Sequence, residues 1–138
     1  MGFRNDTFPT PAGYQAFDYQ TSNNATSSTT YVNCWPSYSF TALVPKTYLL
    51  GVDVQCTATA LTAGRCTVFF QVLVNSTAYP IYENIDMLSM TPYYNASMRT
   101  PVPFVTGSNT IQLQWAVDHV TSTVTAAGFG SRVFSIIA

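Results

Sequence analysis

Apolar and polar residues alternate along most of the chain after Thr29. Even positions carry the apolar side chains over residues 32–44, 50–60 and 66–74, while Asn, Ser, Thr, Asp and Gln occupy many of the odd positions between them. The alternation returns over residues 111–117, where Ile, Leu, Trp and Val take the odd positions. A period of two is the signature of half-buried β-strands, so the pattern predicts strands with one face in a common core.

The turn between the second and third of these segments contains Gly64. Both even-numbered sets face one core only if the loop has an odd number of residues, which favours the three-residue loop Thr62-Ala63-Gly64 with glycine in the left-handed conformation. In that register Cys56 lies opposite Phe70, and a disulfide between Cys56 and Cys66 is excluded. A longer loop, which would permit the disulfide, is the alternative.

The remaining strands are shorter. Alternating segments are expected over residues 79–85 and 87–96, around Val124 and over residues 132–137. Residues 100–105 contain two prolines, which suit an edge strand or a crossing segment because proline has no backbone donor. With no helical periodicity, the chain is expected to be all-β: a jelly-roll-like antiparallel β-sandwich with an extended N-terminal arm.

Residues 1–28 differ from the expected sandwich domain, residues 29–138. They combine prolines with a polar run at 21–28 that lacks periodicity, which is typical of an extended arm or linker. The five aromatic residues in the arm indicate that it packs against another surface, either its own domain or a neighbouring subunit. These interface candidates are Phe3, Phe8, Tyr14, Phe17 and Tyr19.

The composition is poor in charge. Charged residues make up 8% of the chain, against about 25% in ordinary soluble domains, and the net charge is −1. No basic surface can form from five cationic residues, so nucleic-acid binding is excluded. No apolar run is long enough to span a membrane, and residues 1–6 do not resemble a secretory signal. Because like molecules with few charges repel one another weakly, the surface favours association.

The chain lacks the ingredients of common catalytic and metal sites. The odd number of cysteines, all on core-facing parity, favours three buried thiols over a disulfide framework, and no zinc-binding spacing is present. His119 is the single histidine and is expected to be solvated or a capping residue. Glu83 and Asp86 form the one close carboxylate pair, on an expected surface turn. We therefore expect no catalytic residue, no cofactor and no metal.

Tyrosines gather in the middle of the chain. Tyr93 and Tyr94, with Tyr79, Tyr82 and three methionines nearby, have the residue types favoured in interfaces and sugar-binding surfaces. The alternative is that they form the ordinary core and rim of a β-sandwich.

The order of these features resembles a known family. A polar arm leads to residues 48–54 and the turn to residues 68–75, then to Gly107-Ser108-Asn109 before the strand at 111–115, and a strand at 132–137 closes the chain. This is similar to the small jelly-roll structural proteins of tailed bacteriophages, both capsid decoration (cement) proteins and tail-fibre tips. The resemblance covers residues 29–138 and provides no shared functional residue to carry over.

The resemblance implies a non-enzymatic homotrimer at the capsid surface of a virion, assembled in the host cytoplasm. Its partners would be its own copies and the major capsid protein, and it would stabilise the shell through buried interface area. The alternative is a receptor- or carbohydrate-binding tail-tip module that uses the tyrosines.

Overall fold

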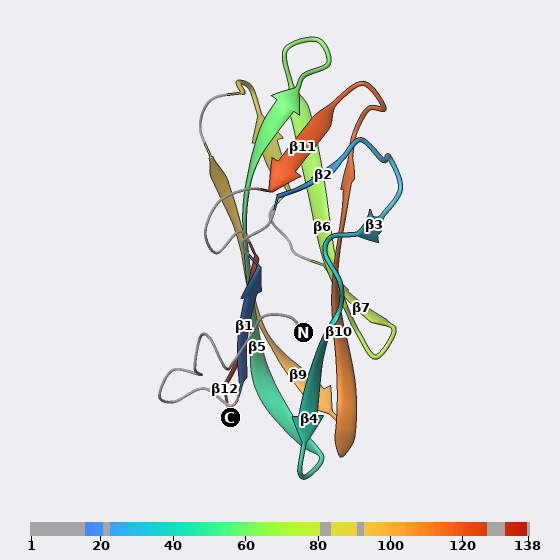
Figure 1. Ribbon diagram of the computed structural model, residues 1–138, viewed down its shortest axis with the longest axis vertical. Helices are drawn as coiled ribbons and strands as arrows, with labels where there is room; N and C mark the ends of the chain where they lie inside the picture. Colours follow the sequence, from blue (N-terminus) through green and yellow to red (C-terminus); the bar gives the residue numbers. More distant parts are fainter. Residues whose placement is uncertain (1–15, 21–22, 81–83, 91–92, 127–131, 138) are drawn as a thin grey trace.

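The computed structural model describes residues 16–20, 23–80, 84–90, 93–126 and 132–137. Within these residues, twelve strands form two six-stranded antiparallel sheets that face each other along the length of the molecule (Figure 1). The all-β antiparallel sandwich expected from the alternation is confirmed. Among the described residues there is no helix with the length and hydropathy needed to cross a membrane.

The first sheet is built around its longest strand, which pairs with three others. Its strands are β1 (Ala16–Gln20), β2 (Asn24–Thr26), β5 (Lys46–Ala60), β9 (Tyr94–Phe104), β11 (Thr123–Ala126) and β12 (Arg132–Ile137). The strand β5 pairs with β9, β12 and β11, and the sheet is completed by β1 beside β12 and β2 beside β11.

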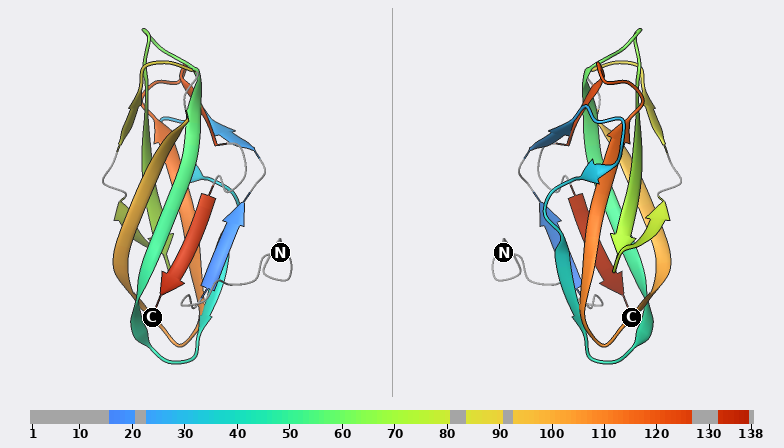
Figure 2. Two further views of the ribbon diagram at one scale, coloured as in Figure 1. Left: turned by 90° about the vertical axis from the view of Figure 1, so that its left-hand side faces the viewer. Right: turned by 90° about the vertical axis from the view of Figure 1, so that its right-hand side faces the viewer.

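The second sheet is centred on β10 and β6, which pair with each other. Its strands are β3 (Val32–Asn33), β4 (Tyr38–Ala42), β6 (Cys66–Val74), β7 (Thr77–Pro80), β8 (Ile85–Met87) and β10 (Gly107–Val117). The neighbours of β10 are β3, β4 and β6, and β6 also pairs with β7 and β8. The right-hand view of Figure 2 looks onto the outer face of this sheet.

The core lies between the sheets and follows the predicted parity. Cys56, Phe70 and Trp115 are all buried, as the alternation predicts. Trp115 stacks on Trp35 with ring centroids 6.4 Å apart and lies 6.2 Å from Phe70. The three cysteines are buried and free, so the expectation of three buried thiols is confirmed. The core also contains Arg132, which donates to the carbonyl oxygen of Pro36 at 2.9 Å.

The expected pairing between residues 50–60 and 66–74 is wrong. The two strands, β5 and β6, belong to different sheets, and Cys56 lies opposite Tyr94 while Phe70 lies opposite Trp115. Period-two burial requires only that two strands face one core, and strands on opposite sides of a sandwich satisfy it as well as neighbours do.

The turn that joins these strands is also shorter than expected. The backbones of Thr62 and Arg65 hydrogen-bond to each other, which leaves Ala63 and Gly64 as a two-residue turn. Both turn residues have positive φ, 52° and 81°, as a type I′ turn requires. The left-handed conformation predicted for Gly64 is therefore confirmed, although the three-residue loop is not.

The prolines near residue 100 lie where the sequence predicted an edge. Pro101 and Pro103 are in β9, which among the described residues pairs with β5 alone. The strands expected around Val124 and over residues 132–137 are present as β11 and β12.

Parts of the expected N-terminal arm belong to the first sheet. Residues 16–20 form β1, whose backbone pairs with β12, and residues 24–26 form β2, which pairs with β11. Residues 1–15 lie outside the described residues. The domain boundary after residue 28 stays a prediction.

Some residues at positions where the alternation predicts a core-facing side chain are exposed. Val44 is 54% exposed because β4 ends at Ala42 and Val44 lies in the turn before β5. Val32, Leu88 and Met90 are exposed as well. Val32 belongs to the two-residue edge strand β3, and Leu88 and Met90 follow the end of β8.

Candidate functional site

The outer face of the second sheet carries a row of amide side chains. In β6 every second residue is buried, and the residues between them are half-buried. In β10, Gln112 and Gln114 are half-buried between buried neighbours. The register places Gln114 opposite Gln71 of β6 on one side and opposite Asn33 of β3 on the other. Three amides therefore lie in line across the neighbouring strands β3, β10 and β6. The right-hand view of Figure 2 shows these three strands side by side.

The three amides are joined by hydrogen bonds. Nε2 of Gln71 donates to Oε1 of Gln114 at 2.8 Å, and Nε2 of Gln114 donates to Oδ1 of Asn33 at 2.9 Å. We call Asn33, Gln71 and Gln114 the amide ladder. Among the described residues, no hydrogen bond engages Oε1 of Gln71 or Nδ2 of Asn33. The ladder thus ends in an open acceptor at β6 and an open donor at β3.

Apolar side chains border the ladder. Phe69 and Leu73, which precede and follow Gln71 on the same face of β6, are half-buried, and neither belongs to the core. Phe69 lies opposite Ala116, whose small side chain is itself covered. Tyr31, directly before β3, is 41% exposed at the edge of the sheet. The surface therefore presents apolar groups beside oriented polar ones.

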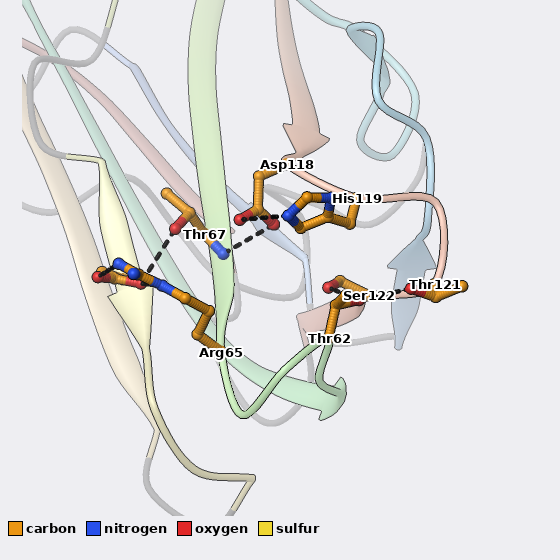
Figure 3. A network of polar contacts seen from close by, with 8 residues as sticks. Thr62, Arg65, Thr67, Asp118, His119, Thr121 and Ser122 are labelled. Carbon is orange, nitrogen blue, oxygen red and sulfur yellow. Dashed lines mark hydrogen bonds and ion pairs between the residues drawn. The ribbon is translucent and has the colours of Figure 1, made fainter.

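A second polar group surrounds the start of β6, where Arg65 and Thr67 lie (Figure 3). Arg65 forms an ion pair with Asp86 of β8, and the hydroxyl of Thr67 donates to Oδ1 of Asp86 at 3.0 Å. The hydrogen bond from Arg65, and next the one from Thr67, hold the pKa of the Asp86 carboxyl below its usual value. The same pairing raises the pKa of Arg65.

This group continues onto the loop between β10 and β11. Oδ1 of Asp118 accepts from the backbone N–H of Thr67 at 3.2 Å, and the exposed ring of His119 lies 3.9 Å from the same carboxylate. The hydroxyls of Thr62 and Ser122 lie 2.8 Å apart. We call this set the apical cluster: Thr62, Arg65, Thr67, Asp86, Asp118, His119, Thr121 and Ser122. Its contacts tie the β5–β6 turn to the β10–β11 loop, and the exposed His119 agrees with the expectation from the sequence.

The described residues offer little for metal binding or nucleophilic chemistry. Among them, no three His, Cys, Asp or Glu side chains are grouped so that they could hold a metal ion. Burial raises the pKa of Cys34, of Cys66 and of Cys56, the last to about 12. Because the thiolate is the nucleophile and the metal ligand, these protonated thiols serve packing.

The interface candidates from the sequence do not form one described surface. Phe3, Phe8 and Tyr14 lie outside the described residues. The backbones of Phe17 and Tyr19 pair with Ser135 and Val133 of β12. Their role in an interface stays a prediction.

The two central tyrosines lie in different environments. Tyr93 is 51% exposed, whereas Tyr94 is half-buried against the core opposite Cys56. Tyr79 also packs against the core, and Tyr82 lies outside the described residues. Tyr79 and Tyr94 therefore contribute to packing against the core while Tyr93 faces solvent, and a role of Tyr93 or Tyr94 in an interface stays a prediction.

The amide ladder was not among the sequence candidates. Gln112 and Gln114 are visible as polar positions between apolar ones, but Asn33 and Gln71 are far away in the sequence. The ladder can be predicted only by combining the outward-facing positions of β6, β10 and β3 with the register in which these strands pair. That register comes only from knowing which strands are neighbours.

Comparison with known proteins returns no match to a protein-family model and none to a curated protein. Among solved structures, the chain is similar to the EclA C-terminal domain, described as a sugar-binding protein, at 11% identity and a TM-score of 0.43 over 94% of this chain and 84% of that one. It is also similar to a CBM35 from Cellvibrio japonicus Abf62, at 15% identity and a TM-score of 0.37 over 91% of each chain.

These comparisons correct the expected resemblance to phage structural proteins. The matched structures are a sugar-binding protein and a carbohydrate-binding module, not capsid decoration or tail proteins. The capsid-stabilising function is therefore wrong, and with it the contact to a major capsid protein, while the expected homotrimer stays a prediction. The resemblance rested on the order of alternating strands, which any antiparallel sandwich shows because each strand buries one of its faces.

Proposed function

We propose that this chain is a non-catalytic carbohydrate-binding module whose sugar-binding surface is the amide ladder with its apolar borders. The observation that carries the proposal is the ladder itself: hydrogen-bonded amides on an outer face, with an acceptor open at one end and a donor open at the other. Sugar binding, which the names of the matched structures state for those proteins, is proposed here from the chemistry of this surface.

Sugars present two kinds of surface. Their hydroxyl groups both donate and accept hydrogen bonds, and their ring C–H groups form apolar patches. Amide side chains supply donors and acceptors together, while Phe69 and Leu73 supply apolar contact. The ladder therefore offers the complementary group for each part of a sugar.

The ladder is also ordered before any ligand arrives. Immobilising a long side chain on binding costs about 0.5–1.5 kcal/mol. In Gln71 and Gln114 the hydrogen bonds along the ladder already restrict the side chains. Because side-chain amides do not ionise near neutral pH, the surface supports binding without acid–base catalysis.

The test is a binding screen with a matched pair of variants. The protein is run through affinity gels that contain soluble polysaccharides and is mixed with insoluble ones, and a retained ligand is then titrated by calorimetry. Q114A should weaken binding about tenfold, the effect of losing roughly 1.4 kcal/mol of hydrogen bonding. Q55A is the control, because Gln55 is a half-buried glutamine of the first sheet that pairs with β9.

The result has clear outcomes once both variants are shown to unfold at nearly the temperature of the unsubstituted protein. Loss of binding in Q114A with retention in Q55A supports the proposal. Binding that survives in Q114A places the sugar elsewhere, and absence of binding to every polysaccharide overturns the function itself.

A further inference from the structure

The amide ladder runs across the strands rather than along one of them. Neighbouring strands lie about 4.8 Å apart, so the three amides repeat at about that interval from β3 through β10 to β6. This interval is close to the length of one pyranose unit in an extended chain. A row of amides at this spacing can therefore place one amide beside each of three successive units of a polysaccharide.

The row continues beyond its last amide. Gln71 lies opposite Pro80 of β7, which is exposed and apolar. At the other end Asn33 belongs to the short strand β3, and its side chain is also exposed. Both ends of the row are exposed, so a chain longer than the ladder can extend past them.

The row is also uncharged. The nearest described charges on this face are Asp86 and Asp118, which flank Thr67 beyond Phe69. The arginine at that end, Arg65, is already paired with Asp86. At that end an acidic sugar would therefore face two carboxylates and, among the described residues, no unpaired arginine. An uncharged sugar would not be repelled by these carboxylates.

From this arrangement we infer that the ligand is an uncharged, extended polysaccharide of pyranose units that lies across β3, β10 and β6, with about one unit at each amide. The inference rests on the proposed function and names the substrate class and its direction on the sheet. Because the ladder has three members, the affinity for an oligosaccharide is expected to rise with its length only until each of the three amides contacts one sugar unit.

The experiment is calorimetric titration with β-1,4-linked oligomers of glucose, mannose and xylose, from one to six units long, and with oligogalacturonides of equal length. For the best uncharged series, affinity should rise at least tenfold from one unit to three and change less than twofold from four to six. Oligogalacturonides should bind at least tenfold more weakly.

A pair of asparagine variants tests whether the polysaccharide lies across the strands from β6 to β3. N33A removes the ladder member at the edge of the sheet, so it should weaken trimer binding severalfold and leave monomer binding within twofold. N95A is the control, because Asn95 is an exposed asparagine of β9 on the other sheet. N33A should keep the thermal midpoint of the unsubstituted protein, since Asn33 is exposed.

The outcomes separate the inference from the proposed function. A monomer that binds as tightly as a trimer overturns the extended ligand while sugar binding at the ladder stands. Oligogalacturonides that bind as well as the uncharged series overturn the uncharged class. If no saccharide of any kind binds, the proposed function fails and the inference with it.

Discussion

On the outer face of the first sheet, Asp53 accepts hydrogen bonds from Arg99 at 2.9 Å and from Ser97 at 2.7 Å, whereas the amide ladder on the second sheet ends in an open donor and an open acceptor. Both arrays are polar, solvent-facing and built from neighbouring strands. The first combines opposite charges that satisfy each other, and Arg99 also donates to the carbonyl oxygen of Met98. The difference shows that polarity alone does not make a binding surface. A ligand needs groups that the fold has oriented but not used.

The largest expected effect is on the closed array and comes from adding one carbon atom. A Cβ at Gly51 would lie 2.5 Å from Oγ of Ser135 and 3.0 Å from Nε of Arg99. G51A should therefore displace both side chains and lower the free energy of unfolding by about 1–3 kcal/mol, as overpacking does. Chemical denaturation measures the change, with S97A, which removes one exposed hydrogen bond, as the milder control. Unchanged stability would show that Arg99 does not need the space above Gly51.

The next effect distinguishes two aromatic positions, the half-buried Phe69 of β6 and the exposed Tyr93 beside β9. F69A should weaken sugar binding by about 0.5–1.5 kcal/mol, roughly threefold to tenfold, because an aromatic ring beside the ladder is lost. Y93A should leave binding unchanged, because Tyr93 adjoins β9 in the other sheet. Titration of both variants with the best ligand makes the comparison. Loss of binding in Y93A alone would move the site to the first sheet.

A smaller effect separates the two arrays by their dependence on salt. Arg99 and Asp53 are about half exposed, so a double-mutant cycle at these positions should give a coupling of about 0.2–1 kcal/mol that shrinks in high salt. The cycle for Gln71 and Gln114 should give a coupling that salt does not change, because both partners are neutral. A salt-sensitive coupling in the ladder would contradict its description as an uncharged array.

The smallest effect is the response of the apical cluster to pH. Because Arg65 and Thr67 lower the pKa of Asp86 in the folded state, their stabilisation is complete above the ordinary value of 3.8 and is lost as the pH falls through the lower folded value. R65Q should raise the pKa of Asp86 in an NMR titration and reduce the loss of stability below pH 4. Sugar binding at the ladder should stay constant from pH 8 to pH 5, since amides do not titrate there.

The expectations that held share one property: each depends on a residue and its near neighbours. Parity along a strand predicted that Cys56, Phe70 and Trp115 are buried, and glycine after Ala63 predicted a left-handed turn. The prolines of β9 predicted an edge strand. The phage resemblance failed because it was drawn from the same strand order, which sandwiches of different function have in common.

The candidate site was beyond such reasoning. Gln71 and Gln114 are 43 residues apart, and Gln114 and Asn33 are 81 residues apart. Nothing near these residues distinguishes them from the many other polar positions on outer faces. They became a candidate site only when three strands were known to be neighbours in a defined register.

The sequence by itself therefore determined the long alternating strands β5, β6 and β10 with their buried sides, the left-handed turn at Gly64 and the free state of the three thiols. The tertiary structure decided which sheet each strand joins, and with it the separation of β5 from β6 and the alignment of the amide ladder. The physical reason is that burial parity is a local property of a strand with one apolar face, while pairing is a choice among strands that all present the same backbone donors and acceptors.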